Sequence, residues 1–252
     1  MAVAITAYAL CDLVHEVAGH GTAALMIPDV SVLSLSTVAL QTSRDSRVVA
    51  ACGSIANIAF GAAALLVVPR FRRLSATAYF CWLFASLNLL NGSGYPLYSA
   101  ALGSGDWDVV IRGLRPAWMW RVALGGVGAL GYVTATGLSA RAAIGAVERD
   151  LLARAEVRPL VFPAYVAGGT LLLVASAFNP ISPSLIFSSG LSSGFAAMAG
   201  LTFVPGLVEA QTTDHEIGNG FVPHSTAWIA TGIIVAALFV AILAPGTFMI
   251  KE

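Results

Sequence analysis

Long apolar segments, separated by short polar or glycine- and proline-rich stretches, make up most of this chain of 252 residues. A membrane-spanning α-helix needs roughly 20 mainly apolar residues, and most of the segments approach or exceed that length. The pattern predicts an all-α integral membrane protein with six to seven transmembrane helices: seven if every segment spans, six if one is re-entrant. The predicted helices are Ala2–Ile27, Val48–Val68, Ser75–Leu90, Ala117–Ile144, Leu160–Phe178, Leu185–Val204 and Thr226–Phe248. No internal repeat stands out, so residues 1–252 are predicted to form a single polytopic domain.

The segments that connect these helices also predict structure. Val30–Thr42 alternates in polarity and is rich in β-branched residues, which predicts a short β-like segment or hairpin after the first helix. The glycine-rich stretch Asn91–Pro96 is predicted to break the third helix. Because lipid cannot satisfy free backbone groups, this break must be buried in protein or line a wet cavity. Polar connections follow at Gly103–Pro116 and, as the longest loop, at Glu209–Ser225.

Composition supports a multi-pass membrane protein in contact with lipid. The chain is 58% hydrophobic and only 10% charged, with a mean hydropathy of +0.83, whereas soluble domains carry roughly 25% charged residues. Net charge is zero and no basic block occurs, so we expect no nucleic-acid partner. The first apolar run has no preceding Lys or Arg, which argues against a cleaved signal peptide. Together with the compact size, this favours a prokaryotic plasma membrane. The three cysteines lie in apolar runs and are interpreted as small core residues.

The first apolar helix contains the motif His15-Glu16-Val17-Ala18-Gly19-His20. Ionisable groups at membrane depth are costly and usually functional. Two imidazoles and a carboxylate are what a hydrolytic zinc site needs: the histidines bind the metal, and the glutamate takes a proton from the bound water. The usual zincin motif is His-Glu-x-x-His, one residue shorter.

That extra residue has a geometric consequence. Residues five apart on a regular α-helix lie about 140° apart around the axis, which separates two ligands. A single π-helical turn, which takes one more residue, would bring His15 and His20 onto one face. Gly19 lies where such a distortion is easiest. The longer spacing resembles the motif of the soluble dipeptidyl peptidase III family, in which it still serves zinc.

Three features together resemble the site-2 protease family of intramembrane zinc metalloproteases, as a divergent member. The first is His15-Glu16-x-x-Gly19-His20, followed by small residues. The second is the strand-like segment followed by Ala51-Cys52-Gly53-Ser54-Ile55-Ala56-Asn57, which is similar to the family's Ala-Gly-Pro-x-Ala-Asn run. The third is Asn88-Leu89-Leu90-Asn91 leading to Tyr95-Pro96-Leu97. The resemblance implies a metalloprotease core in residues 1–110, with additional transmembrane helices in residues 117–252.

The resemblance also suggests site residues. His15 and His20 would bind zinc and Glu16 would be the catalytic base. Where the family places its aspartate ligand, this chain has Tyr98. We therefore expect Asp106, flanked by glycines, to fold back as the third ligand, ahead of Asp108. Three asparagines are expected to line the cleft and bind an extended substrate: Asn57, Asn88 and Asn91. Asp214, His215 and Glu216 form a second, distant candidate cluster, with His224 in the same polar loop.

The predicted function is hydrolysis of peptide bonds in or near membrane segments, with a membrane protein or peptide as substrate. The alternative is a non-proteolytic membrane protein, either a transporter or a protease-like scaffold. In that case His15, Glu16 and His20 form a buried polar cluster with Asp12, one turn earlier. Convergence of the two imidazoles across a bulged turn, with a carboxylate facing them, favours zinc chemistry; divergence on a straight helix favours the alternative.

Overall fold

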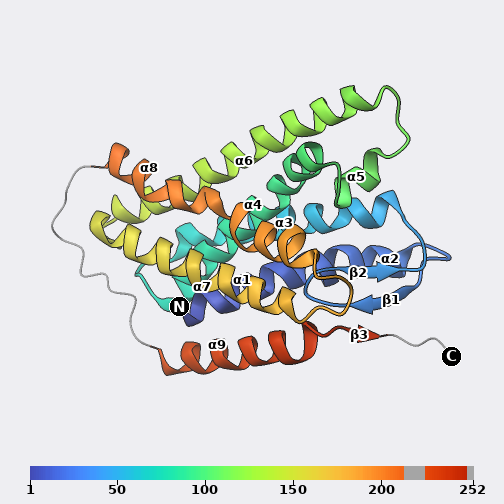
Figure 1. The fold of residues 1–252 in the computed structure, drawn as a ribbon. Helices are drawn as coiled ribbons and strands as arrows, with labels where there is room; N and C mark the ends of the chain where they lie inside the picture. The colour runs from blue at the N-terminus through green and yellow to red at the C-terminus, as the bar shows by residue number, and fades with distance from the viewer. Residues whose placement is uncertain (213–224, 249–252) are drawn as a thin grey trace.

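The computed structural model describes residues 1–212 and 225–248, and it is a bundle of long apolar helices with a small β-sheet at one end (Figure 1). Within these ranges, six helical segments are long and apolar enough to cross a membrane, as the sequence predicts. They are Ala2–Met26, Arg47–Arg70, Ala117–Val147, Arg154–Ala177, Ile186–Gln211 and Thr226–Leu243. The protein is therefore an all-α, multi-pass membrane protein in its architecture.

The first span is a continuous helix that changes from α-helical to π-helical and back to α-helical. It consists of α1 (Ala2–Leu13), the π-helix η1 (Val14–Gly21) and α2 (Thr22–Met26). The β-like segment follows as an antiparallel hairpin of β1 (Val32–Leu35) and β2 (Leu40–Thr42). A third strand, β3 (Thr247–Phe248), pairs antiparallel with β1 and gives the order β2-β1-β3. The predicted hairpin is confirmed, and the sheet marks the end of the bundle near which η1 lies.

The second span is α3 (Arg47–Val67) with the 3-10 turn η2 (Val68–Arg70), and α4 (Ala76–Leu102) follows. The predicted break at residues 91–96 is wrong, because α4 runs through it. The glycine at position 92 instead allows α4 to approach α3 closely: a side chain there would meet the Ser54 carbonyl oxygen at 2.7 Å. α4 is long enough to span but carries many polar residues, which are buried inside the bundle.

The polar connection after α4 contains a short helix that the sequence did not predict, α5 (Asp106–Ile111). Figure 1 shows α5 at the same end of the bundle as the sheet. The long helix α6 (Ala117–Val147) then packs along α4. α5 connects α4 to α6 in the sequence, and in the fold it turns back to contact α3.

The remaining elements enclose the bundle. They are η3 (Arg154–Glu156), α7 (Val157–Ala177), the π-helix η4 (Ile186–Ala196), η5 (Ala199–Phe203), α8 (Val204–Gln211), α9 (Thr226–Leu238) and η6 (Phe239–Leu243). Two predicted boundaries are wrong. α8 extends into the predicted loop as far as Gln211, and the last helix ends at Leu243 because Pro245 and Gly246, with φ of +81°, turn the chain into β3.

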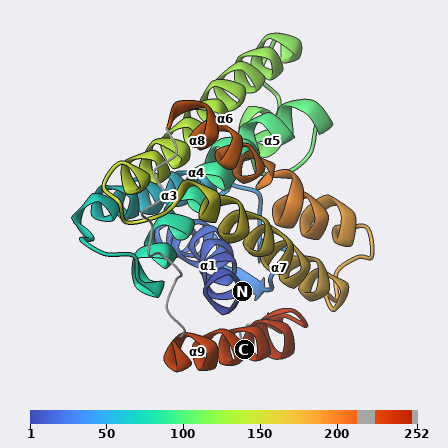
Figure 2. The same ribbon diagram turned by 90° about the vertical axis from the view of Figure 1, so that its left-hand side faces the viewer.

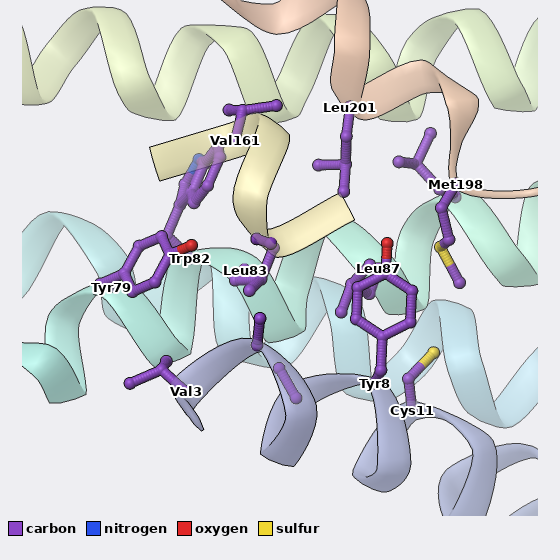
Figure 3. Close-up of a cluster of buried hydrophobic side chains, with 14 of the residues drawn as sticks. Val3, Tyr8, Cys11, Tyr79, Trp82, Leu83, Leu87, Val161, Met198 and Leu201 are labelled. Carbon is purple, nitrogen blue, oxygen red and sulfur yellow. The ribbon is translucent and has the colours of Figure 1, made fainter. Parts of the chain in front are cut away.

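The first helix is the centre of the fold. Figure 2 shows α1 between α4, α7 and α9, and it contacts all three. Tyr8 is fully buried and packs against Gly168 of α7, where a Cβ would lie 2.1 Å from its ring. Apolar side chains from α1, α4, α7 and the η4–η5 region form the surrounding cluster, including Val3, Cys11, Leu83, Leu87, Val161, Met198 and Leu201 (Figure 3). This packing buries α1, and η1 continues the same helix into the protein interior.

Candidate metal centre

The π-helical turn brings the two histidines of the motif together. His15 and His20 both lie in η1, and their side chains are buried, at 3% and 5% exposure. The two imidazole rings lie edge to face with centroids 4.7 Å apart. The π-turn that the spacing predicts is confirmed. The extra residue is absorbed by wider winding, so two side chains that a straight helix would separate face the same point.

Asp106 faces both histidines from α5. Its Oδ2 lies 3.0 Å from His15 Nε2 and 3.3 Å from His20 Nε2. In a tetrahedral zinc site, two ligands at about 2.1 Å from the ion lie roughly 3.4 Å apart. His15, His20 and Asp106 thus form a group that could hold a metal ion, with one ligand atom from each, all within 4.8 Å of one another.

The other nitrogen of each imidazole is bound by an acceptor. His20 Nδ1 lies 2.7 Å from the carbonyl oxygen of Val49, which can only accept, so Nδ1 carries the proton. His15 Nδ1 lies 2.7 Å from Asn57 Oδ1. The Asn57 amide nitrogen donates to the Cys11 carbonyl, which fixes the orientation of the amide and leaves its oxygen to accept from His15. The acceptor at each Nδ1 leaves Nε2 as the nitrogen that faces Asp106, where it can donate a proton to the carboxylate or, once that proton is lost, bind a metal.

The three asparagines form a buried chain behind His15. Asn57 and Asn88 are fully buried and Asn91 is 5% exposed. Asn57 Nδ2 donates to Asn88 Oδ1 at 2.8 Å, and Asn91 Nδ2 donates to Asn57 Oδ1 at 3.2 Å. Their predicted role in substrate binding stays a prediction. In the structure Asn57 bonds His15, while the asparagines bond one another and the Cys11 and Phe84 carbonyl oxygens, so the chain orients the imidazole.

Glu16 lies beside the histidines with one oxygen unpartnered. Its side chain is buried, at 6% exposure, and the backbone N–H of Leu40 in β2 donates to the carboxyl group. Oε2 is buried without a hydrogen-bond partner among the described residues. A buried acceptor left unpaired costs about 1–3 kcal/mol. Glu16 thus has a buried carboxyl oxygen still able to accept a hydrogen bond, in the same π-turn as both histidines. Asp12, one turn before Glu16, is half-buried on α1.

Two glycines allow η1 and α3 to touch at this point. A Cβ on Gly19 would lie 2.5 Å from the Cα of Gly53. A Cβ on Gly53 would lie 2.6 Å from His20 Nε2 and 2.7 Å from His15 Cε1. The imidazoles therefore rest directly on the backbone of α3, where only glycine leaves room for them. Gly53 belongs to the Ala51–Asn57 run noted above, but nothing in the sequence indicates this contact.

Short-range contacts hold Asp106 in place. The chain turns from α4 into α5 through Gly103 and Gly105, with φ of +65° and +83°, a conformation that favours glycine. Trp107 Nε1 then donates to the buried Ser54 hydroxyl on α3 at 3.0 Å. Burial acts to raise the pKa of the Asp106 carboxyl, but hydrogen bonds from His15 and His20 outweigh burial and hold that pKa well below its usual range. The carboxylate is therefore charged and available as a ligand.

The other candidates lie elsewhere. Asp108 pairs with Arg121 at 3.3 Å and with Arg112 at 3.8 Å and faces away from the histidines. The hydroxyl group of Tyr98 donates to the Ser188 carbonyl oxygen at 2.9 Å. The second candidate cluster, Asp214, His215 and Glu216, and the nearby His224 lie outside the described residues. Of the carboxylates considered as third ligand in the described part of the chain, Asp106 is the one brought to both imidazoles.

Sequence reasoning missed the groups that position the ligands. Val49 contributes through its backbone carbonyl, so its side chain gives no signal. In the sequence, Ser54 is a small residue of a predicted transmembrane helix and Trp107 lies in a predicted loop. Nothing there indicates that the two form a hydrogen bond. The comparisons with known proteins add no further assignment: no family model, curated protein or solved structure matches this chain. The function must be argued from the site itself.

Proposed function

We propose that this protein is an intramembrane zinc metalloprotease of the site-2 protease type, which hydrolyses peptide bonds in or near membrane segments. One observation supports this most strongly. A π-helical turn directs Nε2 of His15 and Nε2 of His20 at one oxygen of Asp106, while Glu16 of the same turn keeps a buried oxygen that no described residue hydrogen-bonds.

The donor set fits zinc among the metals that proteins commonly bind. Two neutral imidazoles and one carboxylate are a frequent ligand set of catalytic zinc, which takes three protein ligands and keeps one position open. Hard cations such as Mg²⁺ and Ca²⁺ prefer oxygen ligands throughout. The orientation of both histidines strengthens the fit, since the acceptor at each Nδ1 leaves Nε2 as the nitrogen available to a metal.

The chain's own residues supply the remaining chemistry. When bound, zinc supplies a Lewis acid that acidifies a water molecule and polarises the scissile carbonyl group. Glu16 accepts the proton of the attacking water at its unpartnered oxygen and then donates it to the leaving amine nitrogen. The water oxygen forms the new bond to the carbonyl carbon, and the carbon–nitrogen bond breaks. Asn57 and the Val49 carbonyl keep both imidazoles oriented throughout.

The position of the site suits a substrate that arrives from the membrane. η1 belongs to a membrane span, yet the Asp106 side chain remains 24% exposed at the end of the bundle that carries the sheet. A peptide segment must leave the helical state to present its carbonyl group there, because a helical carbonyl is engaged by its own backbone. The proposed substrate is therefore a membrane or juxtamembrane segment that unwinds locally.

A second candidate is a non-proteolytic membrane protein, either a transporter or a protease-like scaffold. The observation that favours it is that Asp106 lies within hydrogen-bonding distance of both imidazoles. The three side chains can therefore satisfy one another without a metal, as a buried polar cluster. The two candidates differ in metal content and in the role of Glu16.

Metal analysis of the protein purified in detergent without chelators tests the proposal. We expect about one zinc per chain in the wild type, loss of zinc in His20→Ala, and retention in Glu16→Gln. The wild type should also cleave a proteome-derived peptide mixture in micelles, and Glu16→Gln should not. Glu148→Gln, at the exposed end of α6, is the matched control and should keep both properties. Absence of zinc from all variants, even after zinc is added back, would overturn the proposal. Zinc without cleavage would favour the second candidate.

A further inference from the structure

An apolar cavity of about 310 Å³ lies next to the candidate metal centre. It is enclosed by the C-terminal half of α4, by α6 and by the η4–η5 region. Ligand-binding pockets in proteins begin at about this size. The aromatic residues on its wall are Tyr95 and Tyr98 of α4 and Tyr132 of α6. Small residues, among them Gly94 and Ala197, leave the space between them open.

Several polar groups on the wall are already engaged by the protein. The Tyr98 hydroxyl donates to the Ser188 carbonyl oxygen at 2.9 Å. The Tyr132 hydroxyl accepts from the backbone N–H of Gly200 at 2.7 Å. The Ser192 hydroxyl donates to the Phe187 carbonyl oxygen at 3.1 Å. Tyr98 and Tyr132 therefore offer ring surface to the cavity, which suits an apolar occupant.

The cavity and the metal centre share one residue. Tyr95 lines the cavity, and its ring also stacks on the His15 imidazole with centroids 4.7 Å apart and planes 29° apart. The cavity thus begins one aromatic ring away from a candidate ligand. A peptide bound in extended form places successive side chains on opposite sides of its backbone. A residue next to a carbonyl group held at His15, His20 and Asp106 can therefore direct its side chain past Tyr95.

We propose that this cavity binds the large apolar side chain of the substrate residue adjacent to the scissile bond, and so selects aromatic or long aliphatic residues there. This inference rests on the proposed proteolytic function. The occupant is assigned to the substrate because the cavity shares the Tyr95 wall with the metal centre. Ala197 lines the cavity opposite Gly94, with its Cα 4.0 Å from the position of a Cβ on Gly94, so a larger side chain at 197 is expected to fill part of the space.

The test uses two hydroxamates, which bind zinc directly, so it does not depend on turnover. One carries a methyl group next to the hydroxamate and the other a benzyl group. Both are titrated against the zinc-loaded protein in detergent by calorimetry. The proteins are the wild type, Ala197→Phe, and the control Ala129→Phe, whose substitution lies on the exposed face of α6. Zinc content is measured for each.

We expect the benzyl compound to bind the wild type and Ala129→Phe roughly ten- to a hundredfold more tightly than the methyl compound, because the ring is buried. In Ala197→Phe this preference should disappear, while zinc content and methyl-hydroxamate affinity stay unchanged. Equal affinity of the two compounds for the wild type would overturn the inference and leave the metal site intact. A preference for the benzyl compound that survives in Ala197→Phe would also overturn the inference. If in that case a lipid acyl chain is extracted from the wild type but not from Ala197→Phe, the occupant of the cavity is the lipid. Failure of both compounds to bind, with no zinc present, would overturn the metal centre itself.

Discussion

Replacing Gly53 by alanine is expected to weaken metal binding strongly while leaving the bundle folded. The added methyl carbon would lie 2.6 Å from His20 Cε1 and Nε2 and 2.7 Å from His15 Cε1. Favourable contacts between heavy atoms begin near 3.5 Å, so each ring must retreat by roughly 1 Å. The imidazoles cannot easily do so, because Asn57 and the Val49 carbonyl hold their other nitrogens at 2.7 Å.

The size of the effect follows from the tolerance of metal coordination. Ligand distances in metal sites stay within about 0.2 Å of their ideal values, several times less than the displacement that alanine requires. Loss of a single orienting hydrogen bond behind a ligand costs roughly 10- to 100-fold in affinity. Displacing two ligands together should cost at least that upper limit. We therefore expect zinc to bind Gly53→Ala at least about 100-fold more weakly than the wild type.

Competition with a chromophoric chelator measures this affinity in detergent, and thermal unfolding reports whether the bundle remains intact. Gly126→Ala is the matched control: it lies in a transmembrane helix too, and a Cβ there meets nothing within 4 Å. The control should bind zinc as the wild type does. If folded Gly53→Ala binds zinc within about threefold of the wild type, the two imidazoles are not ligands in the arrangement described, and the reasoning is refuted.

Three further substitutions probe the surroundings of the site. Asn57→Ala removes the acceptor of His15 Nδ1 and should weaken zinc binding roughly 10- to 100-fold in the same competition assay; unchanged affinity would contradict an orienting role. Trp107→Phe keeps an aromatic side chain but removes the indole N–H that bonds Ser54. Asp106 is then held less firmly, so zinc should dissociate several times faster. Gly168→Ala places a carbon 2.1 Å from the tyrosine ring of α1 and should destabilise the fold by about 1–3 kcal/mol, seen as a lower Tm. A Tm equal to that of the wild type would show that α7 shifts at little cost.

The local geometry of the first helix was predictable because it follows from spacing alone. Two ligands five positions apart do not share a face of a regular α-helix, and a π-turn is the smallest change that brings them onto one face. The structure contains that turn at Val14–Gly21. The membrane spans were predictable for a similar reason, since the apolar length is set by the thickness of the bilayer.

The continuity of α4 was not predictable from the residues of its C-terminal half. Gly92, Gly94 and Pro96 are helix breakers in an isolated chain, but in the bundle the first of these allows contact with α3 and the second borders the cavity. Tertiary packing therefore outweighs local propensity here. The positions of Trp107 and Ser54 were likewise hidden, because their contact joins elements distant in sequence.

The origin of Asp106 in α5 has a consequence for how the protein is made. His15 and Asp106 are 91 residues apart, so the histidines enter the membrane with the first span, well before the carboxylate is synthesised. A nascent chain at that stage offers only two of the three ligands, and α3, whose Val49 carbonyl and Gly53 backbone support the imidazoles, is still to be inserted. If zinc binds as proposed, high-affinity capture belongs to the end of synthesis, after α3 and α4 have joined the bundle and α5 has folded back. An incomplete chain would in this way be kept from assembling the proposed hydrolytic centre before the bundle that confines it is closed.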